Sequence, residues 1–429
     1  MNRTYYSQLD ETLYTTRLEN GLSVAVVPKK GFTKKLAYFV TDYGSIHTDF
    51  SFEGEVHRVP GGIAHYLEHK LFDMPDGRDV SAEFASYGAI TNAFTSYDMT
   101  AYYFSCTEHF DACLQLLLEF VSTPYFTQES VEKEQGIIDQ EIGMNADAPD
   151  SVVFENLMGA VYRNHPIRVP ILGTSDSIRE ITPELLNLIH RAFYTPSNML
   201  LCVIGDVDPE GVVRLARQVL GTEPAESGVK LLKPQEEMTC PQPLVSRNME
   251  VAMPMFSLAF KCEPLGRGDA AIREEMVADL AAEALFGESS ELYLRLYEEG
   301  IIDSSFGGGF ETIDGCAMLL CSGDSDQPEK VRDALVEQAA KIAAEGLEET
   351  AFERMKRSAL GRRIRGLDSF DSTCFRLCAY HFSDFDYFRF PEIFRDIAPG
   401  EIQSFLGRVV TQQRSSLSVI YPISKEENP

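Results

Sequence analysis

The stretch GGIAHYLEHKLF, residues 61–72, places His65, Glu68 and His69 within about one turn if it folds as a helix. Residues spaced by three and four positions share one face of a helix. Both imidazoles can therefore point at one metal ion with the glutamate carboxylate beside them, and neutral imidazole is a favoured zinc ligand. Two histidines on a polar helix face also occur without any ligand, so this short pattern alone leaves a plain surface helix open.

A second acidic stretch further along the chain can complete such a metal site. A catalytic zinc ion takes three protein ligands and keeps one position open, so the third ligand must come from outside the first helix. The stretch EKEQGIIDQEIGMNAD, residues 132–147, contains Glu134 and Glu141 seven positions apart, hence on nearly the same face of a helix. We expect one carboxylate to bind the metal and the other to lie beside one of its ligands.

Patterns on both sides of the motif predict a mixture of strands and helices. Residues 16–31, TRLENGLSVAVVPKKG, are typical of two strands joined by an Asn-Gly turn, and residues 35–45 of a third strand. Residues 109–126, HFDACLQLLLEFVSTPYF, indicate an amphipathic helix that ends near Pro124. Antiparallel strands interrupted by helices predict an α+β fold.

The length of the chain predicts two domains, because 429 residues exceed what one hydrophobic core usually supports. The segment GTEPAESGVKLLKPQEEMTCPQP, residues 221–243, has several prolines and glycines and few periodic apolar residues, so it is typical of a linker. We therefore predict one domain over residues 1–220 and a second over residues 244–429.

The two halves share a weak internal repeat. Residues 353–368 resemble the acidic stretch described above at an offset of 221 positions, although chance similarity remains an alternative. At this offset His65 corresponds to Phe286 and His69 to Ser290. The second half would then lack the metal-binding residues of the first.

Composition excludes some classes of partner and location. A formal net charge of -28 at pH 7 repels the phosphates of nucleic acids, so no nucleic-acid partner is expected. The N-terminal stretch lacks the apolar core of a signal peptide, and no later run of about twenty apolar residues can span a bilayer. We expect a cytoplasmic protein without a membrane segment.

Several motifs occur together in an order that is shown by one family. The H-x-x-E-H pattern followed by the glutamate pair resembles the M16 (pitrilysin/insulinase) family of metallopeptidases, the inverzincins. The stretches NAFTSYDMTAYYF, HPIRVPILGT and FYTPSNMLLCVIGDVD are similar to that family in the same order, so the likeness covers essentially the whole chain. The resemblance implies two homologous M16-type domains, each a mostly antiparallel sheet with packed helices, of which only the first carries the site.

The resemblance also implies a set of metal ligands. His65 and His69 would bind one Zn²⁺ per chain, Glu141 would be the third ligand, and Glu134 would hold a ligand in place. The 72 residues between His69 and Glu141 are fewer than in the long pitrilysin-type members, which leaves Asp139 as an alternative third ligand.

In that family the glutamate of the motif is the general base, so the resemblance gives Glu68 this role in the hydrolysis of peptide bonds. Residues 88–98, GAITNAFTSYD, resemble the edge strand on which an extended peptide adds as a further strand. Asn92 and Ala93 occupy the positions that match the substrate-facing residues. An ordinary core strand is the alternative.

The second half departs from the pattern of members that act alone. Those members carry an Arg and a Tyr that contact the substrate backbone, whereas residues 290–306 of this chain, SELYLRLYEEGIIDSSF, have Tyr297 and Asp303 at these positions. An ionised aspartate cannot donate a hydrogen bond as a tyrosine does.

This departure makes the chain most similar to the zinc-bearing subunit of two-subunit bacterial M16 peptidases. The resemblance then implies a homologous partner subunit that lacks H-x-x-E-H and carries the Arg/Tyr pair, with a homodimer as the alternative. Unfolded peptides or leader segments would be the substrates. A catalytically silent scaffold subunit is the alternative function, and the intact His65, Glu68, His69 and Glu141 argue against it.

Overall fold

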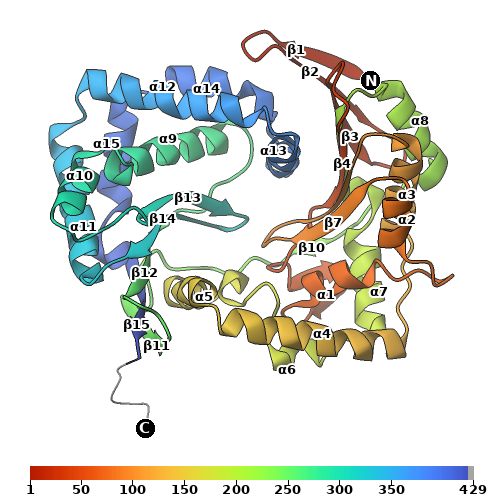
Figure 1. The fold of residues 1–429 in the computed structure, drawn as a ribbon, viewed down its shortest axis with the longest axis horizontal. Coiled ribbons are helices and arrows are strands. Elements are labelled where there is room, and N and C mark those ends of the chain that lie inside the picture. The colour runs from red at the N-terminus through yellow and green to blue at the C-terminus, as the bar shows by residue number, and fades with distance from the viewer. Residues whose placement is uncertain (424–429) are drawn as a thin grey trace. The chain divides into compact units, whose positions relative to one another are not determined.

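The computed structural model describes residues 1–423 and divides into two compact units, each drawn from both halves of the chain (Figure 1). Unit 1 comprises Met1–Ile142, Pro170–Leu232 and Ile364–Arg389, and unit 2 comprises Gly143–Val169, Lys233–Arg363 and the described residues from Phe390 onward.

Unit 1 is built on a seven-stranded sheet with strand β7 at one edge. In spatial order the strands are β1 (Asn2–Tyr6), β2 (Glu11–Arg17), β3 (Ser23–Pro28), β9 (Met199–Gly205), β4 (Lys35–Thr41), β8 (Thr100–Cys106) and β7 (Ile90–Thr95). Only β3 and β9 are parallel neighbours, and the other pairs are antiparallel. Strands β4 and β9 are buried along almost their whole length, because the sheet is covered on both faces. A smaller sheet joins β10 (Lys230–Leu231), β5 (Asp49–Phe52) and β6 (Glu55–Arg58).

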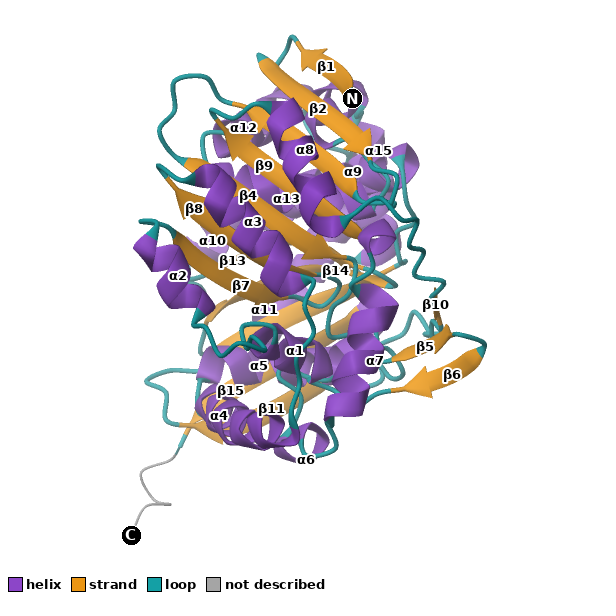
Figure 2. Cartoon of the chain, turned by 90° about the vertical axis from the view of Figure 1, so that its right-hand side faces the viewer, coloured by secondary structure: helices purple, strands orange, loops and turns teal. Residues whose placement is uncertain are grey.

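Helices cover both faces of this large sheet. Helices α3 and α8 lie across one face (Figure 2), and α13 packs against β4 and β9 on the other. The helices of unit 1 are α1 (Ile63–Lys70), α2 (Val80–Ser86), α3 (Phe110–Val121), α6 (Ser175–Ile178), α7 (Pro183–Phe193), α8 (Pro209–Leu220) and α13 (Phe370–Phe382), with short turns η2 (Pro196–Asn198) and η3 (Tyr387–Arg389). Helix α3 ends shortly before Pro124, as the sequence predicts.

Unit 2 contains a five-stranded sheet. Its strands, in spatial order, are β11 (Leu244–Met249), β15 (Ser415–Pro422), β12 (Met255–Cys262), β14 (Cys316–Asp324) and β13 (Gly307–Ile313). Its helices are α5 (Pro149–Val161), α9 (Asp269–Phe286), α10 (Glu291–Glu298), α11 (Pro328–Glu345), α14 (Phe390–Asp396) and α15 (Pro399–Val409), with η1 (Pro166–Arg168) and η4 (Gln412–Arg414). No helix within residues 1–423 is long and apolar enough to cross a membrane.

The two sheets have the same topology, which confirms the predicted α+β fold with a duplicated domain. The order β3-β9-β4-β8-β7 in unit 1 matches the order β11-β15-β12-β14-β13 in unit 2. In each sheet the first of these pairs is parallel and the other three are antiparallel. Two unrelated sheets would not be expected to agree in both strand order and direction.

The topology corrects the residue correspondence that the repeat suggested. Helices α4 (Gln128–Ala146) and α12 (Glu349–Gly366) begin at positions that fit the offset of 221. Helices α1 and α9 occupy the same place in the two topologies, and α9 already ends at Phe286. If the ends of α1 and α9 correspond, His65 lies opposite Ala281 and His69 opposite Leu285. At the offset of 221, by contrast, Phe286 is the last residue of α9 and Ser290 lies beyond it, so this offset does not place one helix on the other; α9 contains no histidine under either alignment.

The units exchange one helix each. Helix α5 comes from the first half of the chain and packs on β12 and β15 in unit 2, whereas α13 comes from the second half and packs in unit 1. The packing of α13 is close, since the Cys374 sulfur lies 3.7 Å from the sulfur of Cys202 on β9. The chain passes between the units within α4 and again within α12.

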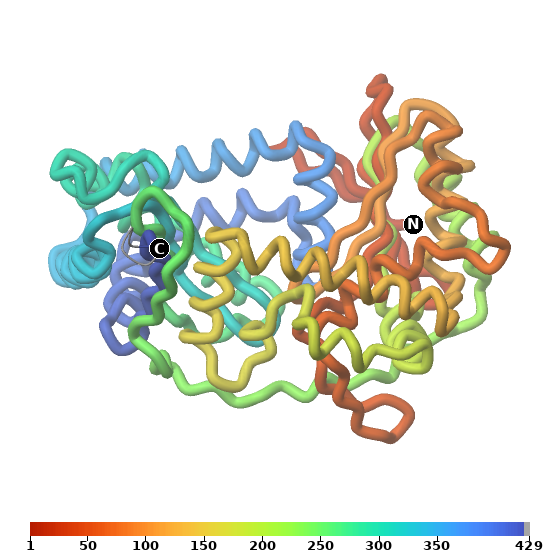
Figure 3. Tube along the Cα trace, turned by 60° about the horizontal axis from the view of Figure 1, so that its bottom comes forward, coloured from red at the N-terminus to blue at the C-terminus, as the bar shows by residue number. Residues whose placement is uncertain are grey.

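The segment predicted as a linker runs as a long extended trace (Figure 3) with β10 as its regular element. It is anchored in unit 2 by Glu236, which pairs with the buried Lys261 at 3.0 Å and accepts backbone hydrogen bonds from Arg163 and His165. The predicted boundary at 221–243 follows the order of the chain, whereas the compact units also exchange α5 and α13.

Candidate metal centre

Helix α1 begins at a point where two loops approach too closely for side chains. Gly62 precedes the helix with a φ of 92°, and a Cβ atom there would lie 2.5 Å from the carbonyl oxygen of Leu172. Gly173 shows the same close approach to the carbonyl of Gly61, which also accepts a hydrogen bond from the Ser177 hydroxyl at 2.8 Å. The glycines are therefore needed to fix where the H-x-x-E-H helix starts.

Contacts between α1 and α4 then fix the helix that carries the acidic pair. The hydroxyl of the buried Tyr66 donates to the carbonyl of Val131. The ammonium of Lys70, which is only 1 % exposed, donates to the carbonyl of Ser130 at 3.2 Å. Both contacts hold the side chains of α1 and α4 in a fixed register.

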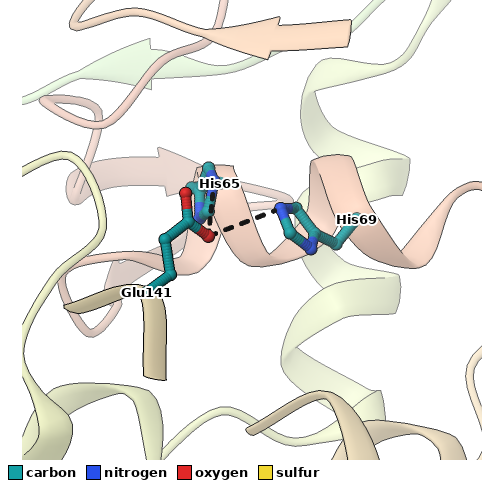
Figure 4. Close-up of side chains that lie close together, drawn as sticks. All are labelled: His65, His69 and Glu141. Atoms are coloured by element: carbon teal, nitrogen blue, oxygen red, sulfur yellow. Dashed lines mark ion pairs between the residues drawn. The ribbon is translucent and has the colours of Figure 1, made fainter. Parts of the chain in front are cut away.

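Three potential metal ligands converge between these helices (Figure 4). His65 Nε2 lies 3.8 Å and His69 Nε2 lies 3.9 Å from Glu141 Oε2, and the three ligand atoms are within 4.8 Å of one another. These separations are too long for hydrogen bonds. The lone pairs therefore face a common space that an ion can occupy, and two imidazoles with one carboxylate form a donor set that suits zinc.

The electrostatics of the two histidines differ. Burial, with a further contribution from His69, lowers the pKa of His65 to about 4, so its imidazole is neutral at physiological pH and can bind a metal. The hydrogen bond to Glu134 raises the pKa of His69. That bond joins His69 Nδ1 and Glu134 Oε1 at 3.0 Å, which leaves Nε2 of His69 directed at Glu141.

Glu134 lies next to the three potential ligands and is not part of the converging group. Its hydrogen bond with His69 holds the pKa of the Glu134 carboxyl below its usual value, and the Lys70 ammonium lies 3.8 Å from its other oxygen. A carboxylate that accepts from the second ring nitrogen of a metal-binding histidine is a common partner in such sites. Asp139, the alternative third ligand, is exposed and is not in the converging group.

Glu68 lies on the same helix and is 8 % exposed. Its Oε2 accepts a hydrogen bond of 2.6 Å from the Thr95 hydroxyl, at the end of strand β7. Burial raises the pKa of Glu68, and the Thr95 hydrogen bond opposes that shift. The site therefore contains a carboxylate whose surroundings favour proton uptake.

Strand β7 is an edge strand, as the sequence analysis expected of residues 88–98. The side-chain oxygen of Asn92 accepts a hydrogen bond of 2.9 Å from the backbone N–H of Ala93. Asn92 is exposed and Ala93 is partly buried against the core of unit 1. The edge N–H of Ala93 is thus capped by its neighbour within the free protein.

Tyr297 and Asp303, which occupy the positions of the Arg/Tyr pair in the second half, both lie in unit 2. Tyr297 is 51 % exposed on α10 and stacks on Tyr293 with ring centroids 6.0 Å apart. Asp303 accepts hydrogen bonds from the backbone and hydroxyl of Ser305, which hold its pKa below the usual value. Asp303 is therefore ionised at neutral pH and can only accept hydrogen bonds.

Two side chains around the motif were missed in the sequence analysis. Lys70 directly follows the H-x-x-E-H pattern, and a lysine beside a predicted carboxylate cluster was a usable signal. Thr95 lies two residues after Ala93, so strand alternation places it on the same face as Ala93. Its contact with Glu68 depends on the tertiary arrangement, and no local pattern gives it.

Family models match both halves of the chain. Residues 58–175 match the model described as insulinase (peptidase family M16), and residues 180–359 match the model described as the peptidase M16 inactive domain. A Bacillus subtilis protein described as the uncharacterized zinc protease YmfH is 36% identical over 425 residues, which cover 98% of this chain and 99% of that protein. A second protein of the same organism, described as the uncharacterized zinc protease YmxG, is 26% identical over 333 residues, covering 74% of this chain and 78% of that protein.

Solved structures show the same fold. A crystal structure described as that of an M16-like peptidase from Alicyclobacillus acidocaldarius matches with a TM-score of 0.91 and 32% identity, over 96% of this chain and 99% of that chain. A protease from Helicobacter pylori matches with a TM-score of 0.80 and 18% identity, over 96% of this chain and 99% of that chain, which shows the fold alone.

Proposed function

The chain belongs to peptidase family M16, and from that premise we propose that it is a zinc-dependent endopeptidase acting on unfolded peptides or leader segments. The observation that carries the proposal is the convergence of His65, His69 and Glu141 beside the buried Glu68. Two imidazoles and one carboxylate that can bind a metal, with the further carboxylate of Glu68 nearby, form a group that suits metal-assisted hydrolysis.

His65 Nε2, His69 Nε2 and Glu141 Oε2 would hold one zinc ion per chain, and Glu134 would fix the orientation of the His69 ring. When bound, zinc supplies a Lewis acid that polarises a peptide carbonyl and lowers the pKa of water. The buried His65 remains neutral, so its lone pair is available without the loss of a proton.

Glu68 acts as the general base in this proposal. Its carboxylate takes the proton from the attacking water and delivers that proton to the leaving amine. Burial raises the pKa of Glu68, which brings its basicity closer to the value that proton transfer near neutral pH requires.

Strand β7 supplies the surface for an extended substrate. Its position at the sheet edge allows a peptide to add as a further strand, with affinity from backbone hydrogen bonds rather than from side-chain recognition. A bound peptide would replace the Asn92 side chain at the N–H of Ala93. This exchange gives Asn92 and Ala93 their roles as substrate-binding residues.

We place the chain as the zinc-bearing half of a heterodimer. Tyr297 and Asp303 stand where single-subunit members carry the Arg/Tyr pair, and the ionised Asp303 cannot donate to a substrate carbonyl. A homologous subunit that has the pair and lacks H-x-x-E-H would supply these donors. A homodimer would have the same departures in both copies, so a heterodimer is favoured.

Removal of the metal is expected to stop hydrolysis. With a quenched unstructured peptide and the Arg/Tyr-bearing subunit present, 1,10-phenanthroline should lower turnover to the background rate, and one equivalent of Zn²⁺ after dialysis should restore it. The non-chelating isomer 1,7-phenanthroline is the matched control. Turnover at the untreated rate by protein shown to be zinc-free would contradict a zinc peptidase, and absence of turnover under all conditions would favour the silent scaffold.

Glu134→Ala is expected to raise the dissociation constant of zinc by roughly ten- to a hundredfold, because His69 Nδ1 loses its carboxylate acceptor. Competition with a chromophoric chelator measures this constant. Glu132→Ala is the matched control, since Glu132 lies on the same helix, is exposed and contacts the side chain of Gln128. Equal zinc affinity in the two variants would show that Glu134 has no part in holding the ligand.

A further inference from the structure

The hydroxyl of Thr95 contacts the carboxylate that we propose as the base. Thr95 Oγ1 lies 2.6 Å from Glu68 Oε2 and is the side-chain hydrogen-bond donor to Glu68 among the described residues. Thr95 is the last residue of β7 and pairs with Thr100 on β8. The Thr100 hydroxyl donates to the carbonyl of Tyr43 at 2.9 Å.

We propose that Thr95 is a positioning residue, which orients the Glu68 carboxylate by a hydrogen bond from the end of the proposed substrate-binding strand. This inference rests on the proposed peptidase function, because it gives Thr95 a role through Glu68 and through no other group. Nothing in the H-x-x-E-H pattern or in the metal-binding group itself assigns a role to Thr95.

The direction of this hydrogen bond follows from the groups involved. An ionised carboxylate can only accept, so Thr95 must donate its single hydroxyl proton to Glu68. The Thr100 hydroxyl, which lies 3.5 Å from Thr95 Oγ1, is engaged at shorter distance by the Tyr43 carbonyl and does not compete for Glu68.

One carboxylate oxygen of Glu68 is thereby held by a hydrogen bond, and the other remains available to accept a proton. Oε2 of Glu68 accepts from Thr95, whereas Oε1 has no hydrogen-bond partner within residues 1–423. A glutamate side chain has three rotatable torsions, and a hydrogen bond to a charged group is stronger than one between neutral groups. The bond therefore restricts the carboxylate to an orientation in which Oε1 is available to a water proton.

The position of Thr95 also joins substrate binding to the base. Alternation along β7 places Thr91, Ala93 and Thr95 on one face of the strand, and Thr95 contacts helix α1 through Glu68. A peptide that adds to β7 and the Glu68 carboxylate that is hydrogen-bonded by Thr95 would both be positioned by the same strand. This arrangement fixes the distance between a bound peptide and the proton acceptor, which is what efficient proton transfer requires.

The strand contains a matched control for the test. Thr91 lies on the same face of β7, but its hydroxyl donates to the backbone carbonyl of Tyr103 at 3.0 Å. Thr91→Val and Thr95→Val remove the same hydroxyl from the same strand and keep the β-branched shape. Thr95→Ser keeps the hydroxyl and removes only a methyl group.

The experiment compares these variants with the wild-type chain in the presence of the Arg/Tyr-bearing subunit, on the quenched unstructured peptide. We expect Thr95→Val to lower kcat by about ten- to a hundredfold, the usual effect of losing a hydrogen bond to a charged group. KM should stay within about twofold, since the backbone edge of β7 is unchanged. Zinc content and melting temperature should match the wild type, and Thr95→Ser should recover most of kcat.

Three results would overturn the inference. A kcat of Thr95→Val within twofold of the wild type, or an equal loss in Thr91→Val, would show that the hydroxyl does not act through Glu68. A loss in Thr95→Ser as large as in Thr95→Val would indicate a packing effect. If Thr95→Val fails to fold, Thr95→Ala and Thr95→Ser give the same comparison. Absence of wild-type turnover with full zinc would instead overturn the proposed function.

Discussion

Glu68→Gln is expected to retain one equivalent of zinc and to lose hydrolysis by about 10²- to 10⁴-fold, the range attributed to general-base catalysis. The substitution keeps the size of the side chain, and its amide oxygen can still accept the Thr95 hydrogen bond. An amide cannot take a proton from water near neutral pH. The loss should therefore appear in kcat while the metal stays bound.

His65→Ala and His69→Ala, unlike Glu68→Gln, should lose zinc as well as activity. Each removes one of three ligand atoms that converge on one point, so zinc content is expected to fall towards zero and activity with it. Elemental analysis of the purified variants separates the two classes. His57→Ala is the matched control, because His57 lies on β6 outside the converging group. Full zinc in either ligand variant would contradict the site.

The second large effect concerns the partner. The chain alone is expected to hydrolyse an unstructured peptide poorly, and turnover should rise by at least about tenfold when a homologous subunit with the Arg/Tyr pair is added in equal amount. Zinc and Glu68 can supply the attacking group, but an extended substrate must also be held so that its carbonyl lies close to it. In the proposed pair the ionised Asp303 cannot donate a hydrogen bond, and Tyr297 offers a single hydroxyl where the single-subunit members carry an arginine guanidinium.

Turnover measured at matched zinc content, first with the lone chain and then with the partner, tests this expectation. The control is a partner in which the Arg and Tyr are replaced by Ala and Phe, which should associate but not restore turnover. Full activity of the lone chain would refute the shared site and leave the peptidase proposal in place. Activity that rises with the square of the concentration of the lone chain would indicate a homodimer.

Local sequence patterns predicted much of what positions the site. The spacing of His65, Glu68 and His69 predicted a shared helix face, and the structure has all three on α1. The interval between Glu134 and Glu141 predicted one helix, which is α4. These predictions depend on periodicity along one element, and periodicity is what a single sequence records well.

Other features depend on contacts between distant segments and could not be derived in this way. The contact between Thr95 and Glu68 joins a strand end to a helix, and neither residue type is unusual at its position. The correspondence of His65 with Phe286 does not hold because the offset between matching elements changes along the chain: β7 and β13 begin 217 positions apart, at Ile90 and Gly307, whereas α4 and α12 begin 221 positions apart, at Gln128 and Glu349. A single offset cannot align all the matching elements of the two halves. The strand order in the two sheets identifies these elements without any offset.

The exchange of α5 and α13 has a consequence for how this chain could have arisen. Two separate copies of one half, each giving a helix to the other, would form a swapped dimer whose formation depends on concentration. The segment 221–243 joins the halves, so the same exchange occurs within one molecule at a fixed high effective concentration. Each sheet buries apolar surface under a helix that comes from the other half of the chain. Fusion of the halves therefore makes permanent an association that separate copies would have to re-form at every encounter.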